Sequence, residues 1–322
     1  MLAAVRHIGT RTLRRTLGIV ALAALTAGVV QAQGPITLFI SAVDASGAAV
    51  DDLKPEEISY KESGNAGKIV SVEKFSLPVK LTIAVDNGSE SETALSHYRS
   101  SLTDLVNLLP MDMEVTLITM APQPRMVVRP TTKREEILRG LTRFAPEQQP
   151  ARFTDTIVEY SQRLEKEVKD SKDKRLSYSP VLILVSTTAP ESTSYPNVAD
   201  VSKAIANIAN VGGRVHIAMT TTKVGSTESV ADLNSGRQAL IGIPLTKQTR
   251  GRYEGLAQSS RLATLLPEYG KNVLDAHNRQ IKQVKVTIER PAGATGNPQD
   301  LDVRLLRPGL NGGVSGNGLF YP

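Results

Sequence analysis

The sequence predicts an α/β protein whose core is a mainly parallel β-sheet with helices on both faces. From Lys80 onward, short apolar runs alternate with segments of ten to eighteen residues that carry apolar side chains at helical spacing. This alternation is typical of parallel strands that are joined through helices. Apolar residues make up 40% of the 322 residues, enough for a packed core.

Residues 33–79 predict an N-terminal β module ahead of this sheet. The runs "ITLFISAV", "ISYKES" and "KIVSVEKF" alternate apolar and polar side chains, and "DASGAA" and "GNAG" supply turns between them. In "KPEEI", Pro55 stands where it could open a single helical turn.

Residues 80–280 contain the predicted main domain. "SPVLILVSTT" is its most apolar run, which predicts a central strand that is buried on both faces. The other predicted strands are "KLTIAVD", "MEVTLITMA", "PRMVVRPT" and "RVHIAMTTT". The predicted helices are "ETALSHYRSSLTDLVNLL", "KREEILRGLTRF", "TDTIVEYSQRLEKEV" and "NVADVSKAIANIANVG".

The last third of the chain is less regular. A stretch rich in Gly, Ser and Thr, from Thr222 to about Arg250, predicts a loop, and "RYEGLAQSSRLATLLPEYGKNVLDAHNRQIK" predicts helix. Residues 281–322 predict C-terminal β-strands, "QVKVTIERP" and "DLDVRLLRP", followed by a tail rich in Gly and Asn. These strands could pair with those of residues 33–79.

Residues 1–32 have the pattern of a cleaved signal peptide. Arg6, Arg11, Arg14 and Arg15 precede an apolar run of 15 residues, which is short for a membrane span, and "VQA" then offers a cleavage site after Ala32. We therefore expect an exported protein, periplasmic or secreted, with no membrane span after cleavage.

Charge and cysteine content narrow the function classes. Removing four Arg and no acid from the leader lowers the formal net charge from +6 to +2, which gives no reason to expect nucleic acid or an anionic membrane as partner. The chain has no Cys, and this excludes disulfides and thiolate metal sites.

The loop "VDNGSES", Val85 to Ser91, is the first candidate for a functional site. It follows a buried strand, and ligands of parallel sheets bind at the carboxyl ends of strands. Asp86 could hold a cation there. It could equally form a turn and cap the following helix together with Ser89 or Ser91.

The chain resembles the bacterial von Willebrand factor A-related family of exported proteins. The resemblance lies in "VDASGAAVDDLKPEEISYKESGNAGKIVSVEKF" before the main domain, in "TRGRYEGLAQSS", and in the final "VKVTIERP", "VRLLRPGL" and "GLFYP". It implies a Rossmann-like von Willebrand A-type domain with an N-terminal β extension and C-terminal strands. It also implies adhesion or another protein–protein interaction, and a site for Mg²⁺ or Mn²⁺ built by three loops.

This sequence departs from the metal-site pattern that the resemblance implies. Asp86 is kept, but Gly88 and Glu90 stand at the two serine positions, with Ser89 and Ser91 one residue out of register. Ala151 stands where a threonine is expected, so that only a shift would let Thr154 serve, and Thr187 replaces the second aspartate. We expect the metal site to be lost. The alternative is a rebuilt, weak Mg²⁺ or Mn²⁺ site with Asp86, Glu90 and Ser89 as ligands.

The sequence contains no common catalytic motif. The sequence contains no Gly-x-Ser-x-Gly, no His-Glu-x-x-His and no P-loop. His216 lies in a predicted strand and His277 on a polar helix face. We therefore expect no enzyme and no cofactor, but an envelope, scaffold or adhesion module that binds a protein partner. Its binding loops would contain Asp86, Ser91, Arg152, Asp155, Thr187 and Thr188.

Overall fold

The computed structural model of the chain describes residues 34–221, 236–292, 294 and 300–320. The predicted signal peptide, residues 1–32, lies outside the described residues. Among the residues that the structure does describe, none of the helices has the length and hydropathy needed to cross a bilayer.

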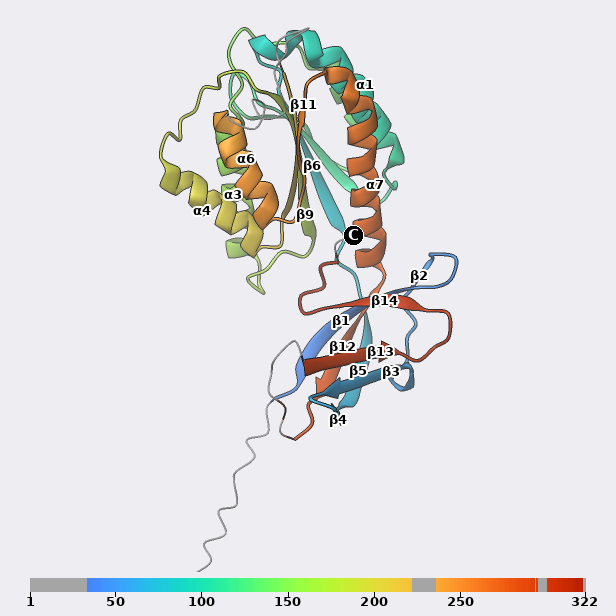
Figure 1. Cartoon of the computed structure of the whole chain (residues 1–322). Helices are drawn as coiled ribbons and strands as arrows, with labels where there is room; N and C mark the ends of the chain where they lie inside the picture. The colour runs from blue at the N-terminus through green and yellow to red at the C-terminus, as the bar shows by residue number, and fades with distance from the viewer. Residues whose placement is uncertain (1–33, 222–235, 293, 295–299, 321–322) are drawn as a thin grey trace, which may run out of the picture.

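The described chain forms two bodies, a sheet body and a β module, which lie one above the other in Figure 1. The sheet body contains a six-stranded sheet of order β11-β10-β9-β6-β7-β8. Its strands are β6 (Val79–Val85), β7 (Glu114–Thr119), β8 (Arg125–Thr131), β9 (Ser179–Thr187), β10 (Arg214–Thr220) and β11 (Tyr253–Leu256). Five of the strands are parallel, and only β8, at one edge, is antiparallel to its neighbour.

Helices cover both faces of this sheet (Figure 1). On one face lie α1 (Leu95–Leu108), α2 (Arg134–Arg143) and α7 (Leu262–Ile281), and on the other α3 (Phe153–Asp170), α4 (Val198–Asn210) and α6 (Arg237–Gln248). Two short 3₁₀ helices, η2 (Ser89–Ala94) and η3 (Ser259–Arg261), precede α1 and α7.

The strand β9 shows why the sheet needs two layers of helices. All nine of its residues are buried. Val181, Ile183 and Val185 pack with the first group of helices, whereas Leu182 and Leu184 pack with the second. Successive side chains of a strand point to opposite faces, so an unbroken apolar run requires a partner on each side. The predicted central strand is confirmed.

The β module is built from both ends of the chain. In one sheet the order is β14-β1-β12-β5, with β2 paired to β1, and in a second sheet it is β13-β3-β4. All pairs are antiparallel. The strands are β1 (Ile36–Val43), β2 (Ala49–Val50), β3 (Ile58–Glu62), β4 (Asn65–Ala66), β5 (Lys68–Phe75), β12 (Gln283–Glu289), β13 (Leu301–Leu305) and β14 (Asn311–Ser315).

The two sheets of the module enclose a small core of their own, which includes Ile40, Tyr60 and Val286. Pro55 opens the short 3₁₀ helix η1 (Pro55–Glu57), as predicted. The sheets of the module are therefore antiparallel, and the mainly parallel arrangement predicted for the protein applies to the sheet body only.

The structure corrects four local predictions. The stretch expected to be loop as far as Arg250 contains α6, whose Pro244 and Gly242 weaken the helical pattern. Residues Tyr253–Leu256, expected to be helical, form the edge strand β11. The glycine-rich tail contains β14, which pairs with β1.

The fourth correction concerns His277, which was expected on a polar face. It is 1% exposed. The end of α7 packs against the start of β6, so that Nδ1 of His277 accepts a hydrogen bond from the backbone N–H of Val79 at 3.3 Å.

Candidate functional site

Three loops meet at the carboxyl edge of the six-stranded sheet. They are residues 86–91 after β6, residues 145–155 before and at the start of α3, and residues 186–195 at the end of β9 and beyond. Because β6 and β9 are neighbouring parallel strands, their ends lie side by side. The structure thus brings together the three segments that the sequence singled out, residues 86–91, 149–155 and 186–195, and adds residues 145–148 to the second.

Asp86 lies at the centre of this edge and is 2% exposed. Its Oδ1 accepts the N–H of Gly88 at 2.9 Å. Its Oδ2 accepts the hydroxyl of Ser186 at 2.8 Å and both the N–H and the hydroxyl of Thr187 at 3.2 Å. Asp86 therefore forms a turn and joins two loops, with its carboxylate fully engaged by donors of the chain.

The second loop lies directly on the first. Asn87 accepts the N–H of Ala121 and donates to the carbonyl of Ala145, both at 3.0 Å. A Cβ placed on Gly88 would stand 2.7 Å from the backbone nitrogen of Ala151. The position at which the family pattern has a serine therefore has no room for any side chain.

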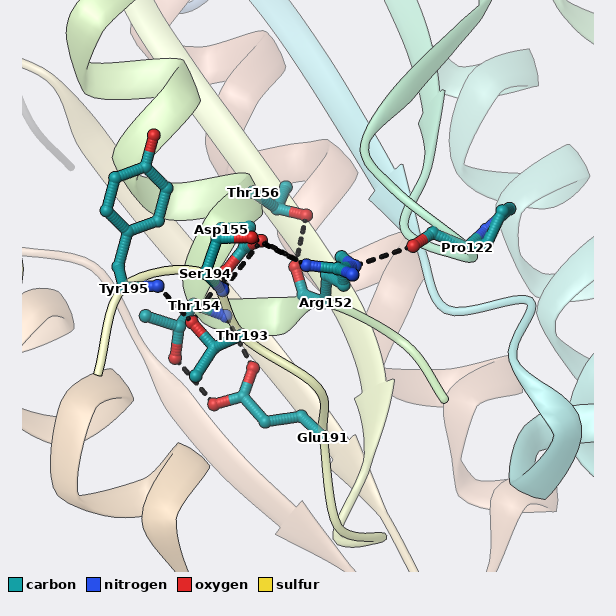
Figure 2. A network of polar contacts seen from close by, with 9 residues as sticks. All are labelled: Pro122, Arg152, Thr154, Asp155, Thr156, Glu191, Thr193, Ser194 and Tyr195. Carbon is teal, nitrogen blue, oxygen red and sulfur yellow. Dashed lines mark hydrogen bonds and ion pairs between the residues drawn. The ribbon is translucent and has the colours of Figure 1, made fainter. Parts of the chain in front are cut away.

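Asp155 and Arg152 form an ion pair at the start of α3, which Figure 2 shows. The Asp155 side chain is 3% exposed and pairs with the guanidinium of Arg152 at 3.0 Å. Its Oδ1 also accepts the hydroxyl of Thr193 at 2.6 Å and the N–H of Ser194 at 2.9 Å. Arg152 in turn donates to the carbonyl of Pro122 at 2.6 Å and to the hydroxyl of Ser194 at 2.8 Å. The guanidinium group of Arg152 thus links the start of α3 to Pro122 and to Ser194.

Glu191 is the third acid of the site that accepts hydrogen bonds from the chain, and its side chain is 2% exposed. It accepts the N–H of Thr154 at 2.7 Å and the Thr154 hydroxyl at 2.5 Å (Figure 2). Arg237 lies 3.3 Å from the same carboxylate. Burial raises the pKa of Glu191 above its ordinary value, against the opposite effect of the two Thr154 hydrogen bonds.

The remaining predicted site residues differ in exposure. Ser91 is fully buried, and its hydroxyl donates to the carbonyl of Gly88. Thr188 is half-buried, and its N–H donates to Thr220. Ser89 is half-buried and Glu90 exposed. Glu90, Asp86 and Glu191 line one hollow of about 10 Å³, which is the volume that a single water needs.

The oxygen atoms available at this edge of the sheet do not fit the coordination of a divalent cation. Mg²⁺ takes an octahedron of oxygen ligands and retains several of its waters. Here the carboxylates of Asp86, Asp155 and Glu191 already accept hydrogen bonds from the chain, and two of them face arginines. Within the described ranges, no three acidic or His side chains converge closely enough to hold a metal ion.

Part of this network was not predicted from the sequence. Glu191 and Arg237 were not singled out, and Thr154 was considered only as a shifted metal ligand. The Thr154–Glu191 contact joins residues 37 positions apart, so no local sequence pattern could predict it. The only signal was an acid within a loop rich in Ser and Thr.

Comparisons with known proteins find similar solved structures at low identity. No family model matches the chain, and no curated protein matches its sequence. A solved structure of BatB from Bacteroides thetaiotaomicron has 16% identity and a TM-score of 0.42, over 60% of this chain and 98% of that one. A von Willebrand factor type A protein from Catenulispora acidiphila has 9% identity and a TM-score of 0.47, over 83% of this chain and 68% of that one.

A third neighbour is the VWA domain of SpRpn10, with 11% identity and a TM-score of 0.42 over 59% of this chain and 95% of that one. At such identities and TM-scores, these neighbours carry no conclusion about what this chain binds.

Proposed function

We propose that this chain, as a von Willebrand A-related protein, is a non-enzymatic binding module that recognises a protein partner without a metal ion. One observation carries the proposal. The three acids at the loop edge, Asp86, Asp155 and Glu191, all accept hydrogen bonds from donors of the chain, and Arg152 supplies a positive charge among them. The loops are therefore held in one arrangement by their own side chains.

Loops that a rigid sheet holds in place are a common location for binding sites. The loop edge has exposed side chains around its buried centre, including Glu90, Glu92, Gln148 and Ser194. A preformed loop surface loses less conformational entropy on binding than a flexible one, which favours affinity. We therefore assign partner recognition to these rim residues, and the positioning of the loops to the buried acids.

The proposed setting is outside the cytoplasm, in adhesion, envelope assembly or scaffolding. The predicted leader at residues 1–32 supports this. No catalytic role is included because neither buried histidine lies near the loop edge: His216 is in the middle of β10, and His277 lies beside the first residue of β6.

The competing function is a metal-dependent adhesion module that uses Asp86 and Glu90. Its only structural support is that the two carboxylates line the same hollow. In that case an ion would bridge to an acid of the partner, and chelation would abolish binding.

Photo-crosslinking separates these two functions. A photoreactive residue is placed at Gln148 or Glu92 on the loop edge, or at Met111, which is 70% exposed in the loop before β7 at the opposite edge of the sheet. Envelope extract from the source cells is the probe. We expect one crosslinked protein at Gln148 and Glu92 but not at Met111, with equal yield in EDTA and in millimolar Mg²⁺ or Mn²⁺.

A crosslink that disappears in EDTA and returns with Mg²⁺ would replace this proposal with the metal-dependent one. Equal crosslinking at all three positions, or none at the loop edge, would contradict a binding role for the loops.

A further inference from the structure

The sheet body and the β module are joined by only two short stretches of backbone in the described chain. Residues 76–78 connect β5 to β6, and Lys282 connects α7 to β12. The two stretches lie together, because the N–H of Leu77 donates to the carbonyl of Gln280 at 2.9 Å. Beside these connections α7 also lies close to β1, and Nε2 of Gln283 donates to the carbonyl of Gln280 at 2.9 Å. Two adjacent single-chain connections are a place at which two bodies can turn relative to each other, unless other contacts fix the angle.

The C-terminal tail, Gly316–Phe320, is anchored on the β module. Phe320 is 7% exposed, and its ring lies 3.5 Å from the position that a Cβ on Gly313 would take. Gln283, fully buried at the start of β12, donates from Nε2 to the carbonyl of Gly318 at 3.0 Å. Gly318 has a φ of +81°, and this left-handed turn brings the tail back over Phe39 and Phe75.

The same tail also reaches the sheet body. The Cδ1 atom of Leu319 lies 2.1 Å from where a Cβ on Gly212 would stand, so the leucine packs directly on the turn between α4 and β10. Gln280, fully buried near the end of α7, donates from Nε2 to the carbonyl of Phe320 at 3.1 Å. Two neighbouring tail residues thus contact both bodies.

Open space lies on either side of this contact. One groove of about 800 Å³ lies between Phe39 and Phe75 of the module and the segment from Glu167 to Tyr178 of the sheet body. A second groove of about 520 Å³ lies between residues 248–250 and residues 314–317. Gly316, Asn317 and Leu319 line both grooves, so the tail forms the wall between them.

We propose that the tail Gly316–Phe320 is a strap that holds the two bodies at one angle, and that its release lets them move about the hinge at residues 76–78 and 282. With the strap removed, the two grooves merge along the line where the bodies now touch it. The apolar contacts of Leu319 and Phe320 and the two glutamine hydrogen bonds are the interactions that would be lost.

The test measures the distance between the bodies directly. The chain has no cysteine, so Lys61→Cys on β3 and Ser202→Cys on α4, both exposed, give a unique pair for spin labels. We expect a single narrow distance distribution in the parent protein. In the double variant Leu319→Ala, Phe320→Ala, we expect a distribution at least twice as broad. The control is Leu306→Ala, a leucine that is 55% exposed after β13, and it should leave the width unchanged.

A second variant ends the chain after Ser315 and removes the whole strap. Circular dichroism and the unfolding midpoint show whether each labelled variant is folded. A narrow, unshifted distribution in a folded strapless variant would overturn the proposal. If the shortened chain does not fold, the double alanine variant decides alone, and an unchanged width in it has the same meaning.

Discussion

At the scale of single residues, Gly88 is the most informative departure from the metal-site pattern that the sequence resemblance implies. A serine at position 88 would restore the hydroxyl ligand of the metal-site pattern. The backbone nitrogen of Ala151 occupies that space, 2.7 Å from where a Cβ would be. The absence of a serine hydroxyl at this position therefore has a structural cause, since the two loops can approach this closely only if residue 88 has no side chain.

We predict that Gly88→Ser lowers the free energy of unfolding by about 1–3 kcal/mol, the usual range for side chains forced into filled space. The matched control is Gly34→Ser, because nothing lies within 4 Å of a Cβ at Gly34. Urea unfolding in EDTA and in millimolar Mg²⁺ measures both variants. A Gly88→Ser protein that is more stable than the parent, and only in Mg²⁺, would show that the site accepts an ion after all.

His216 makes a second prediction at this scale. It is 2% exposed, its ring lies 4.8 Å from that of Tyr269, and neither ring nitrogen has a hydrogen-bond partner among the described residues. Burial, together with the charges of Arg214 and Arg252, lowers its pKa to about 3. Between about pH 6.5 and pH 3 the unfolded chain binds a proton here that the folded chain does not. Stability should therefore fall with falling pH, by about 1.4 kcal/mol per unit.

In His216→Phe, this contribution disappears, since the phenyl ring does not titrate. We expect its acid unfolding midpoint to lie at a lower pH than that of the parent protein. His97→Gln, at an exposed position of α1, serves as the control and should follow the parent curve. Parallel acid-unfolding curves for His216→Phe and the parent would rule out His216 as a source of the slope.

The candidate site could be located from the sequence, but its internal contacts could not. Asp86 follows an apolar strand, which places it at the carboxyl edge of the sheet. Arg152 and Asp155 pair locally, three residues apart, but the bonds of Asp155 to Thr193 and Ser194 depend on the course of an irregular loop, and so does the contact of Glu191 with Thr154. Such contacts between distant residues follow from packing and not from any spacing in the sequence.

At the scale of elements, strands and helices with a clear apolar period were predicted well. The run "ITLFISAV" is β1, and "KIVSVEKF" is β5. The elements that were missed each lack such a period. The four residues of β11 are half-buried, β14 contains two glycines, and α6 contains a proline. Their structure depends on the neighbouring elements against which they pack.

The two sheets of the β module are also joined by a buried ion pair. Glu62, at the end of β3, is fully buried, and it accepts from Nε of Arg290, just past β12, at 2.9 Å. Its Oε2 also accepts the hydroxyl of Tyr60 at 2.7 Å. The pair fixes how one sheet of the module lies on the other.

We predict that Glu62→Ala lowers stability by more than the loss of a surface ion pair, because it removes a fully buried carboxylate that accepts from both Arg290 and Tyr60. The control is Glu73→Ala, whose carboxylate lies 3.9 Å from Lys285 in an exposed pair and should cost less than about 1 kcal/mol. Urea unfolding measures both. Equal losses in the two variants would mean that the buried pair is no stronger than a surface one.

At the scale of the whole molecule, the β module encloses the sheet body in sequence. Its first strands precede the body and its last strands follow it, so that residues 79–281 are an insertion between β5 and β12. The rigid edge with the engaged acids and the hinge with its strap lie at opposite ends of the six strands. Recognition and movement are thus assigned to separate parts of one protein.

The position of β12 between β1 and β5 has a consequence for synthesis of the chain. A chain that is interrupted between Phe75 and Gln283 contains β1 and β5 but not the strand that separates them. Their backbone groups then stay unpaired, and exposed strand edges invite aggregation. Such a chain can contain the strands of the sheet body while its β module stays incomplete.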